Sequence, residues 1–140
     1  MDTKLKILFV EDNPADLRMI KVFILEGNIL FDSLVVETHE DFVDAINSYK
    51  PDIILSDYNL PKFNGMEALN IRNQLLPDTP FILITGSINE ETAVNSLKSG
   101  ADDYILKDNL RRLNNAIMNA LEQKRATRER ELAEKRLMLS

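Results

Sequence analysis

Five short runs of apolar residues recur along the chain, and each run is continuous rather than alternating. The runs lie at residues 7–10, 34–36, 53–55, 81–84 and 104–106. Continuous apolar runs of this length are typical of parallel strands that are buried on both faces of a sheet. The pattern therefore predicts five strands within one domain.

The segments between and after these runs place their apolar residues at helical spacing. This spacing predicts helices over residues 15–26, 39–49, 66–76, 90–99 and from 109 onward. Strands that alternate with helices over short connections predict a single parallel sheet with helices on both faces. Gly27 and Gly100 follow two of the helices, where we expect left-handed C-caps.

A chain of alternating strands and helices could also be half of a dinucleotide-binding fold. That fold requires a Gly-x-Gly-x-x-Gly turn after its first strand. Residues 11–16 instead read Glu-Asp-Asn-Pro-Ala-Asp, with no glycine and with three acids that would repel a pyrophosphate. The sequence therefore argues against dinucleotide binding.

Polar residues follow four of the five apolar runs. They comprise carboxylates, hydroxyls and one ammonium: Glu11, Asp12, Asp57, Thr85, Ser87 and Lys107. Because ligands bind outside the carboxyl ends of parallel strands, we expect these side chains to share one edge of the sheet. Helix capping explains an isolated Asp or Thr at such a place, but Glu11 and Lys107 are poor N-caps.

The residue types limit the chemistry of this edge. The chain has no cysteine and a single histidine, which excludes thiolate zinc sites and multi-histidine metal sites. Neighbouring carboxylates repel one another unless a cation intervenes or one is protonated, and oxygen-only ligands favour Mg²⁺ or Mn²⁺. A carboxylate can also act as a nucleophile, with Lys107 and Thr85 meeting the phosphoryl oxygens. The residues thus indicate a candidate site for phosphoryl transfer onto Asp57.

These motifs resemble the receiver domain of two-component response regulators. They read Val-Glu-Asp-Asn at 10–13, Ser-Asp-Tyr-Asn-Leu-Pro at 56–61 with Asn-Gly at 64–65, Ile-Thr-Gly at 84–86, and Gly-Ala-Asp-Asp-Tyr at 100–104 ahead of Lys107. The resemblance covers residues 4–121 and implies a flavodoxin-like (βα)5 three-layer α/β sandwich with strand order 2-1-3-4-5. It also implies a phosphoacceptor signalling domain.

The resemblance implies a role for each residue of the acidic site. Asp57 matches the phosphoacceptor of the family, and Lys107 matches its phosphate partner. Glu11 and Asp12 match the acidic pair around the metal, with Asp12 as the direct ligand. Asn59 matches the position whose backbone carbonyl completes the metal shell beside Asp57. The implied cofactor is Mg²⁺ or Mn²⁺, and the implied phosphodonor is a histidine kinase or a phosphotransfer protein.

Thr85 and Tyr104 match the hydroxyl and the aromatic ring that respond to phosphorylation in the family. Their movement remodels the surface of the fourth helix, fifth strand and fifth helix, where an output domain or partner binds. Ser87 flanks the site. Asp108 departs from the family, because most receivers have a cis proline directly after the lysine. A cis bond before a non-proline residue costs about 2.5–4 kcal/mol, so we expect a trans peptide.

Two other functions fit part of the pattern. Haloacid-dehalogenase-like phosphatases also pair a strand-end aspartate with Mg²⁺, but their Asp-x-Asp motif would need an acid at Asn59. A pseudo-receiver that acts only through protein contacts would not need the intact set of acids with Thr85 and Lys107. We therefore expect self-phosphorylation and self-dephosphorylation only, and no enzymatic turnover. The Leu-Lys-Asp-Asn-Leu run resembles a receiver subgroup that is often fused to sensor, kinase or cyclase domains.

Charge divides the chain into two parts. Residues 1–121 carry 19 acids and 11 bases, a net charge of −8, whereas residues 122–140 carry 4 acids and 6 bases, a net charge of +2. We expect a receiver domain over 1–121 and a helical extension over 122–140. In the extension, Glu131 and Lys135 form a favourable i,i+4 pair. The extension is interpreted as a linker helix toward an output domain or as a dimer seam.

The composition also bears on partners and location. The acidic body argues against direct nucleic-acid binding, which requires a basic face to neutralise phosphates. No apolar stretch reaches the length of a transmembrane helix, so we expect no membrane association. The predicted location is the cytoplasm.

Overall fold

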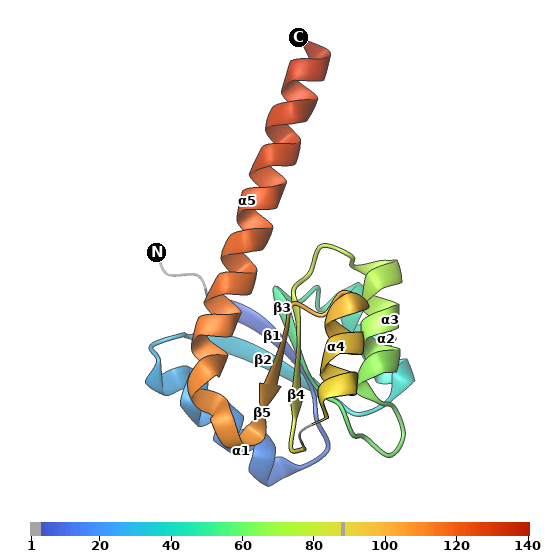
Figure 1. Cartoon of the computed structure of the whole chain (residues 1–140), viewed down its shortest axis with the longest axis vertical. Helices are drawn as coiled ribbons and strands as arrows, with labels where there is room; N and C mark the ends of the chain where they lie inside the picture. The colour runs from blue at the N-terminus through green and yellow to red at the C-terminus, as the bar shows by residue number, and fades with distance from the viewer. Residues whose placement is uncertain (1–3, 88) are drawn as a thin grey trace.

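Strands and helices alternate along the computed structural model, which describes residues 4–87 and 89–140 (Figure 1). The elements are β1 (Leu5–Val10), α1 (Pro14–Glu26), β2 (Phe31–Val36), α2 (His39–Ser48), β3 (Ile53–Asp57), α3 (Gly65–Leu75), β4 (Phe81–Thr85), α4 (Glu90–Lys98), β5 (Asp103–Leu106), the 3₁₀ helix η1 (Lys107–Arg112) and α5 (Leu113–Leu139). Residues 1–3 of the predicted receiver unit lie outside the described part. Every predicted strand and helix is present.

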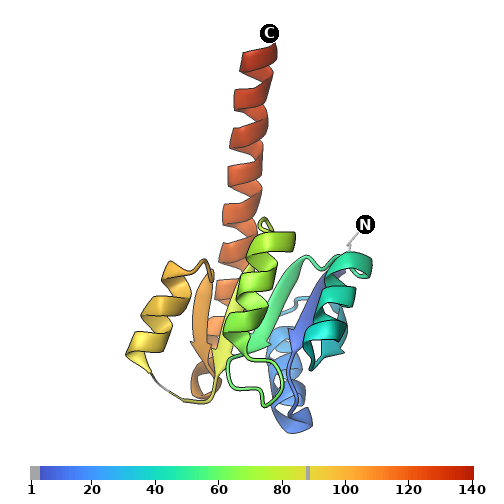
Figure 2. The same cartoon turned by 90° about the vertical axis from the view of Figure 1, so that its right-hand side faces the viewer.

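The five strands form one parallel sheet in the order β2-β1-β3-β4-β5. Helices α1 and α5 cover one face of the sheet, and α2, α3 and α4 lie on the other (Figures 1 and 2). The predicted flavodoxin-like three-layer sandwich is therefore confirmed. Within residues 4–87 and 89–140, no helix is both long enough and apolar enough to cross a membrane.

Burial of the strands depends on their place in the sheet. Strands β3 and β4 are buried throughout, and β1 is buried over its last four residues. Strand β2 lies at an edge and leaves Leu34 and Val35 each 37% exposed. The prediction of burial on both faces is right for the three central strands and wrong for the edge strands β2 and β5, because an edge strand has a neighbour on one side only.

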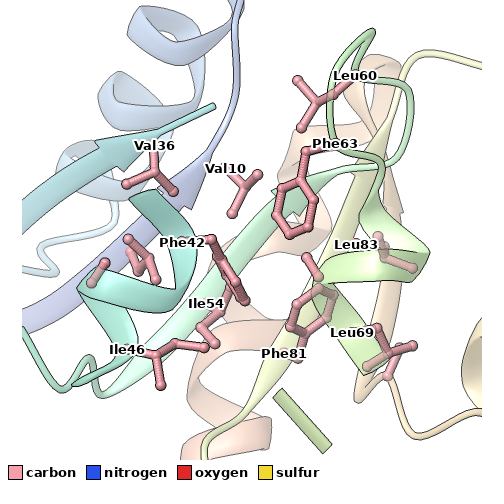
Figure 3. Close-up of a cluster of buried hydrophobic side chains, with 14 residues drawn as sticks. Val10, Val36, Phe42, Ile46, Ile54, Leu60, Phe63, Leu69, Phe81 and Leu83 are labelled. Carbon is pink, nitrogen blue, oxygen red and sulfur yellow. The ribbon is translucent and has the colours of Figure 1, made fainter. Parts of the chain in front are cut away.

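Three phenylalanines lie at the centre of the core beneath α2 and α3 (Figure 3). Phe42 of α2, Phe63 of the loop between β3 and α3, and Phe81 of β4 are all buried, and the rings of Phe42 and Phe63 lie 5.4 Å apart, centroid to centroid. Each aromatic ring of this kind removes a large apolar surface from water when it is buried. They fix α2 and the loop after β3 against the sheet.

The cap of α1 and its packing against α5 depend on local chemistry. The Oδ1 atom of Asn13 accepts hydrogen bonds from the backbone N–H groups of Ala15 (2.9 Å) and Asp16 (3.1 Å), which caps α1. At the other end Gly27 has φ −84°, so the predicted left-handed cap is wrong there. A Cβ at Gly27 would collide with the side-chain amide of Asn114 on α5, so the glycine leaves room for this amide to donate to the carbonyl of Phe23 on α1 (2.9 Å).

The left-handed conformation after α1 belongs instead to Asn28, with φ 64°. Asparagine tolerates this region better than most residues with a side chain, because its short amide can hydrogen-bond locally. At the end of α4 the prediction is confirmed, since Gly100 has φ 111°. The two sites differ because Gly27 is needed to leave space for a neighbouring side chain, whereas Gly100 is needed for its backbone conformation.

Helix α5 continues without a break to Leu139 and projects away from the body (Figures 1 and 2). The predicted extended helix is therefore confirmed. Near the middle of α5, Lys124 forms an ion pair with Asp78 in the loop after α3 (3.2 Å). Farther along, Arg125 pairs with Glu122 and Glu129, and the predicted pair of Glu131 with Lys135 is not among the ion pairs of the described residues.

We expect Phe42→Ala to lower the free energy of unfolding by about 3–5 kcal/mol, because it removes a buried ring and leaves a cavity beside Phe63. Urea unfolding followed by circular dichroism measures this loss. Leu137→Ala is the matched control, since Leu137 is 75% exposed on the projecting helix and should change stability by less than about 0.5 kcal/mol. Equal losses in the two variants would contradict this description of the core.

Candidate functional site

The register of the sheet brings the predicted site residues together. Val10 of β1 is level with Ser56 of β3, so the residues that follow them, Glu11 and Asp57, come side by side. Asp57 is level with Ile84, which precedes Thr85. Thr85 is level with Leu106, which precedes Lys107. Adjacent strands thus deliver two carboxylates, a hydroxyl and an ammonium to one edge of the sheet.

Three carboxylates gather at this edge. One oxygen each of Glu11, Asp12 and Asp57 lies within 4.8 Å of the others. Glu11 and Asp57 are 4% and 8% exposed, whereas Asp12 is exposed to solvent. An oxygen-only cluster with one solvent-facing member suits a hard divalent cation that keeps part of its water shell. These three residues could therefore hold a metal ion.

The ammonium of Lys107 offsets part of this negative charge. Its Nζ lies 2.9 Å from Oε1 of Glu11 and 3.3 Å from Oδ2 of Asp57. The Lys107–Asp108 peptide is trans, as predicted, since there is no cis peptide among the described residues. Lys107 therefore reaches the carboxylate of Asp57 from a trans peptide, with Asp108 rather than a proline as the next residue.

A fourth carboxylate, that of Asp16, contacts Lys107 at 2.7 Å through Oδ2. The sequence interpretation did not assign Asp16 to the site. The signal was present, because Asn13 as N-cap and Pro14 as first helical residue place Asp16 in the first turn of α1, next to the strand edge. An acid in the first turn also has an ordinary explanation in the helix dipole, which is why the pattern did not stand out.

Burial and charge act in opposite directions on the ionisable groups here. Burial, together with the nearby charge of Asp57, raises the pKa of Glu11 to about 6, although the hydrogen bond from Lys107 acts in the opposite direction. Burial lowers the pKa of Lys107, but hydrogen bonds to Asp16 and Glu11 outweigh it and leave that pKa above its usual value. Lys107 therefore stays a cation, and Glu11 takes up a proton at a higher pH than an ordinary glutamate does.

The loop after β3 shapes the surroundings of Asp57. The backbone N–H of Asn59 donates to Oδ1 of Asp57 (3.4 Å), and the N–H of Gly65 donates to the carbonyl of Tyr58 (3.0 Å). A Cβ at Gly65 would meet the carbonyl oxygen of Asp57 at 2.9 Å, so the start of α3 can lie this close only with glycine. The loop thus orients one oxygen of Asp57 and leaves the other toward Lys107.

Thr85, Ser87 and Tyr104 form a connected group beside the carboxylates. Thr85 is 1% exposed, and its Oγ1 accepts from the backbone N–H of Ser87 (3.5 Å). The carbonyl of Ser87 accepts from the Tyr104 hydroxyl (3.5 Å). Burial raises the pKa of Tyr104, while hydrogen bonding with Thr85 lowers it. The predicted hydroxyl, flanking residue and aromatic ring are therefore in contact as one chain of groups.

The response regulator receiver domain family matches residues 7–118, which include this whole site. The chain belongs to this family. Receiver domains are the phosphoacceptor signalling domains of two-component systems, and they take their phosphoryl groups from histidine kinases or phosphotransfer proteins.

Relatives of this receiver include whole regulators and single domains. The phosphate regulon transcriptional regulatory protein PhoB of Klebsiella pneumoniae is 36% identical over 104 residues, which are 73% of this chain and 44% of PhoB. The chain therefore spans less than half the length of that curated relative. A solved CheY-like receiver domain protein from Methanospirillum hungatei JF-1 has a TM-score of 0.76 at 28% identity, covering 89% of this chain and 99% of that one.

A third relative was solved with a metal. The Mn²⁺-bound form of the response regulator Rcp1 has a TM-score of 0.68 at 26% identity, covering 79% of this receiver and 90% of that chain. The relatives found are regulators, and the receiver described here shares their fold and family.

We expect Lys107→Met to lower the free energy of unfolding by about 2–4 kcal/mol without divalent ions, because buried carboxylates lose their cation. Protonation of Glu11 limits the loss. Millimolar Mg²⁺ should raise the melting temperature of this variant more than that of the unaltered protein. Lys98→Met, at an exposed position at the end of α4, is the control, and a similar response in both variants would contradict the assigned role of Lys107.

Proposed function

We propose that this chain carries a signal by accepting a phosphoryl group on Asp57. The observation that supports it most is the approach of the Lys107 ammonium to Oδ2 of a nearly buried Asp57, beside two further carboxylates. A carboxylate in this setting is a nucleophile with a neighbouring cation that can meet incoming negative charge. Family membership supports the same role.

The proposed step is a displacement at phosphorus. A carboxylate oxygen of Asp57 attacks the phosphorus of a phosphohistidine, the P–N bond breaks, and the imidazole leaves with the electron pair and takes up a proton. Lys107 and the hydroxyl of Thr85 then hydrogen-bond to the phosphoryl oxygens. In the separate step of dephosphorylation, water attacks phosphorus and loses a proton to solvent, the P–O bond to Asp57 breaks, and inorganic phosphate leaves while the carboxylate is restored.

A divalent cation fits the donor set of this site. We propose that Asp12 and Asp57, with the backbone carbonyl of Asn59 and with Glu11 nearby, would hold Mg²⁺ or Mn²⁺. The Mn²⁺-bound form of Rcp1 supports this choice of ion. When bound, the cation neutralises charge on the phosphoryl oxygens. Glu11 and Asp12 contribute negative charge that attracts the cation, and Lys107 reduces the repulsion between Glu11 and Asp57.

We further propose that Thr85, Ser87 and Tyr104 report the state of Asp57. Their hydrogen bonds run from the buried hydroxyl of Thr85 to the half-buried ring of Tyr104 near α4 and η1. A shift of Thr85 toward the phosphoryl group would therefore reach the surface formed by α4, β5 and α5. In this proposal the phosphodonor is a histidine kinase or phosphotransfer protein in the cytoplasm, and an output domain or partner binds that surface.

We expect acetyl phosphate with Mg²⁺ to add the mass of one phosphate to the protein, and Asp57→Asn to abolish this gain because the nucleophile is lost. Intact-protein mass spectrometry measures it. Asp44→Asn, an exposed acid on α2, should be phosphorylated normally, and chelation of Mg²⁺ should prevent the reaction. Turnover of small phosphate esters without a mass gain would instead favour a phosphatase.

We also propose that residues 1–121 form the receiver unit and residues 122–140 a helical linker. The buried residues of α5 end at Ala120, and beyond it the helix contacts the body through Lys124, which pairs with Asp78 and donates to the carbonyl of Pro77 (3.4 Å). Exposed ion pairs contribute little to stability. This supports a unit whose core is complete before the linker begins.

Truncation after Leu121 should leave phosphorylation unchanged and lower the free energy of unfolding by less than about 1 kcal/mol. Urea unfolding and mass spectrometry test the two statements. Lys124→Ala in the full chain is the matched control, because it removes the ion pair without removing the helix. A truncated chain that fails to fold or to accept phosphate would refute the proposed boundary.

A further inference from the structure

Asp16 makes the shortest contact that Lys107 has with any carboxylate. The Nζ of Lys107 lies 2.7 Å from Oδ2 of Asp16, compared with 2.9 Å to Glu11 and 3.3 Å to Asp57. Asp16 is not one of the three carboxylates that could share a cation. It therefore acts on the site through its contact with Lys107 and through its negative charge, and not as a member of the cation-binding group.

The contact between Asp16 and Lys107 matters because the ammonium of Lys107 has a limited number of N–H donors. A lysine has three N–H donors and no acceptor, and three carboxylates surround this one. The backbone of Asp16 is held in place, because its N–H donates to the N-cap side chain of Asn13 (3.1 Å). Asp16 therefore draws the ammonium toward α1 from a fixed position, and the weakest of the three contacts is the one to Asp57.

We propose that Asp16 is a positioning residue that divides the charge of Lys107 between helix α1 and the acceptor site. This rests on the proposed function of Asp57. By drawing Lys107 toward α1, Asp16 leaves Asp57 less neutralised and more attractive to a divalent cation. It also weakens the hold of Lys107 on a phosphoryl group, both by competing for a donor and by adding a negative charge.

Removal of the charge on Asp16 should therefore shift the binding of a cation and of an oxyanion in opposite directions. In Asp16→Asn, Lys107 turns toward Asp57 and Glu11, so Mg²⁺ meets less negative charge and binds less tightly. A tetrahedral anion on Asp57 meets a freer lysine and one fewer carboxylate, so it binds more tightly. If Asp16 only stabilised α1, the substitution would weaken the binding of both the cation and the anion, or would change neither.

Isothermal titration calorimetry on the full chain tests this with two probes. Mg²⁺ is titrated alone, and beryllofluoride, an analogue of the phosphoryl group, is titrated at saturating Mg²⁺. For Asp16→Asn we expect the Kd of Mg²⁺ to rise about three- to tenfold and the Kd of beryllofluoride to fall by about the same factor. Asp16→Glu keeps the charge and should restore values near those of the unaltered protein.

Asp41→Asn is the matched control. Asp41 occupies the same place in the first turn of α2, where its N–H donates to the N-cap oxygen of Thr38 (3.2 Å), and it has no ion pair among the described residues. It should change neither affinity. Loss of both affinities in Asp16→Asn, no change in either, or equal effects in Asp41→Asn would overturn the role of Asp16. An unaltered protein that binds neither probe would overturn the proposed function itself.

Discussion

One ammonium group compensates the carboxylates that gather where the parallel strands end. Glu11 and Asp57 are nearly buried, and such charges repel each other strongly unless a cation lies between them. Lys107 supplies that cation from the first residue after β5, at the start of η1. Three features position the carboxylates around Lys107. The register of the sheet places Glu11 beside Asp57, the cap of α1 holds Asp16, and the loop after β3 orients Asp57.

Such a concentration of charge needs a rigid support. The central strands β1, β3 and β4 provide it, because they are packed on both faces by helices and pair in a parallel register. Buried apolar packing stabilises the domain enough to tolerate an acidic edge that is unfavourable on its own. The edge strand β2 and the projecting helix, by contrast, leave apolar side chains exposed and contribute less to this support.

Much of this organisation could be predicted from the sequence. Continuous apolar runs identified the strands, and polar residues after them identified Asp57, Thr85 and Lys107, because parallel strands bring their ends to one edge. Asp16 was missed, since its contact with Lys107 joins residues far apart in the chain and an acid in a first helical turn is common. The role of Gly27 was misjudged for a similar reason, because its constraint comes from Asn114 on another helix.

The direct connection of Lys107 to η1 and α5 gives the long helix a mechanical property. A helix of 27 residues is about 40 Å long at 1.5 Å per residue. Its buried residues end at Ala120, and the 19 residues from 121 to 139 span about 28 Å, so a tilt of about 5° at Ala120 would move the tip by roughly 2–3 Å. The helix would thus enlarge a small displacement of its packed part into a movement of several ångströms at its end.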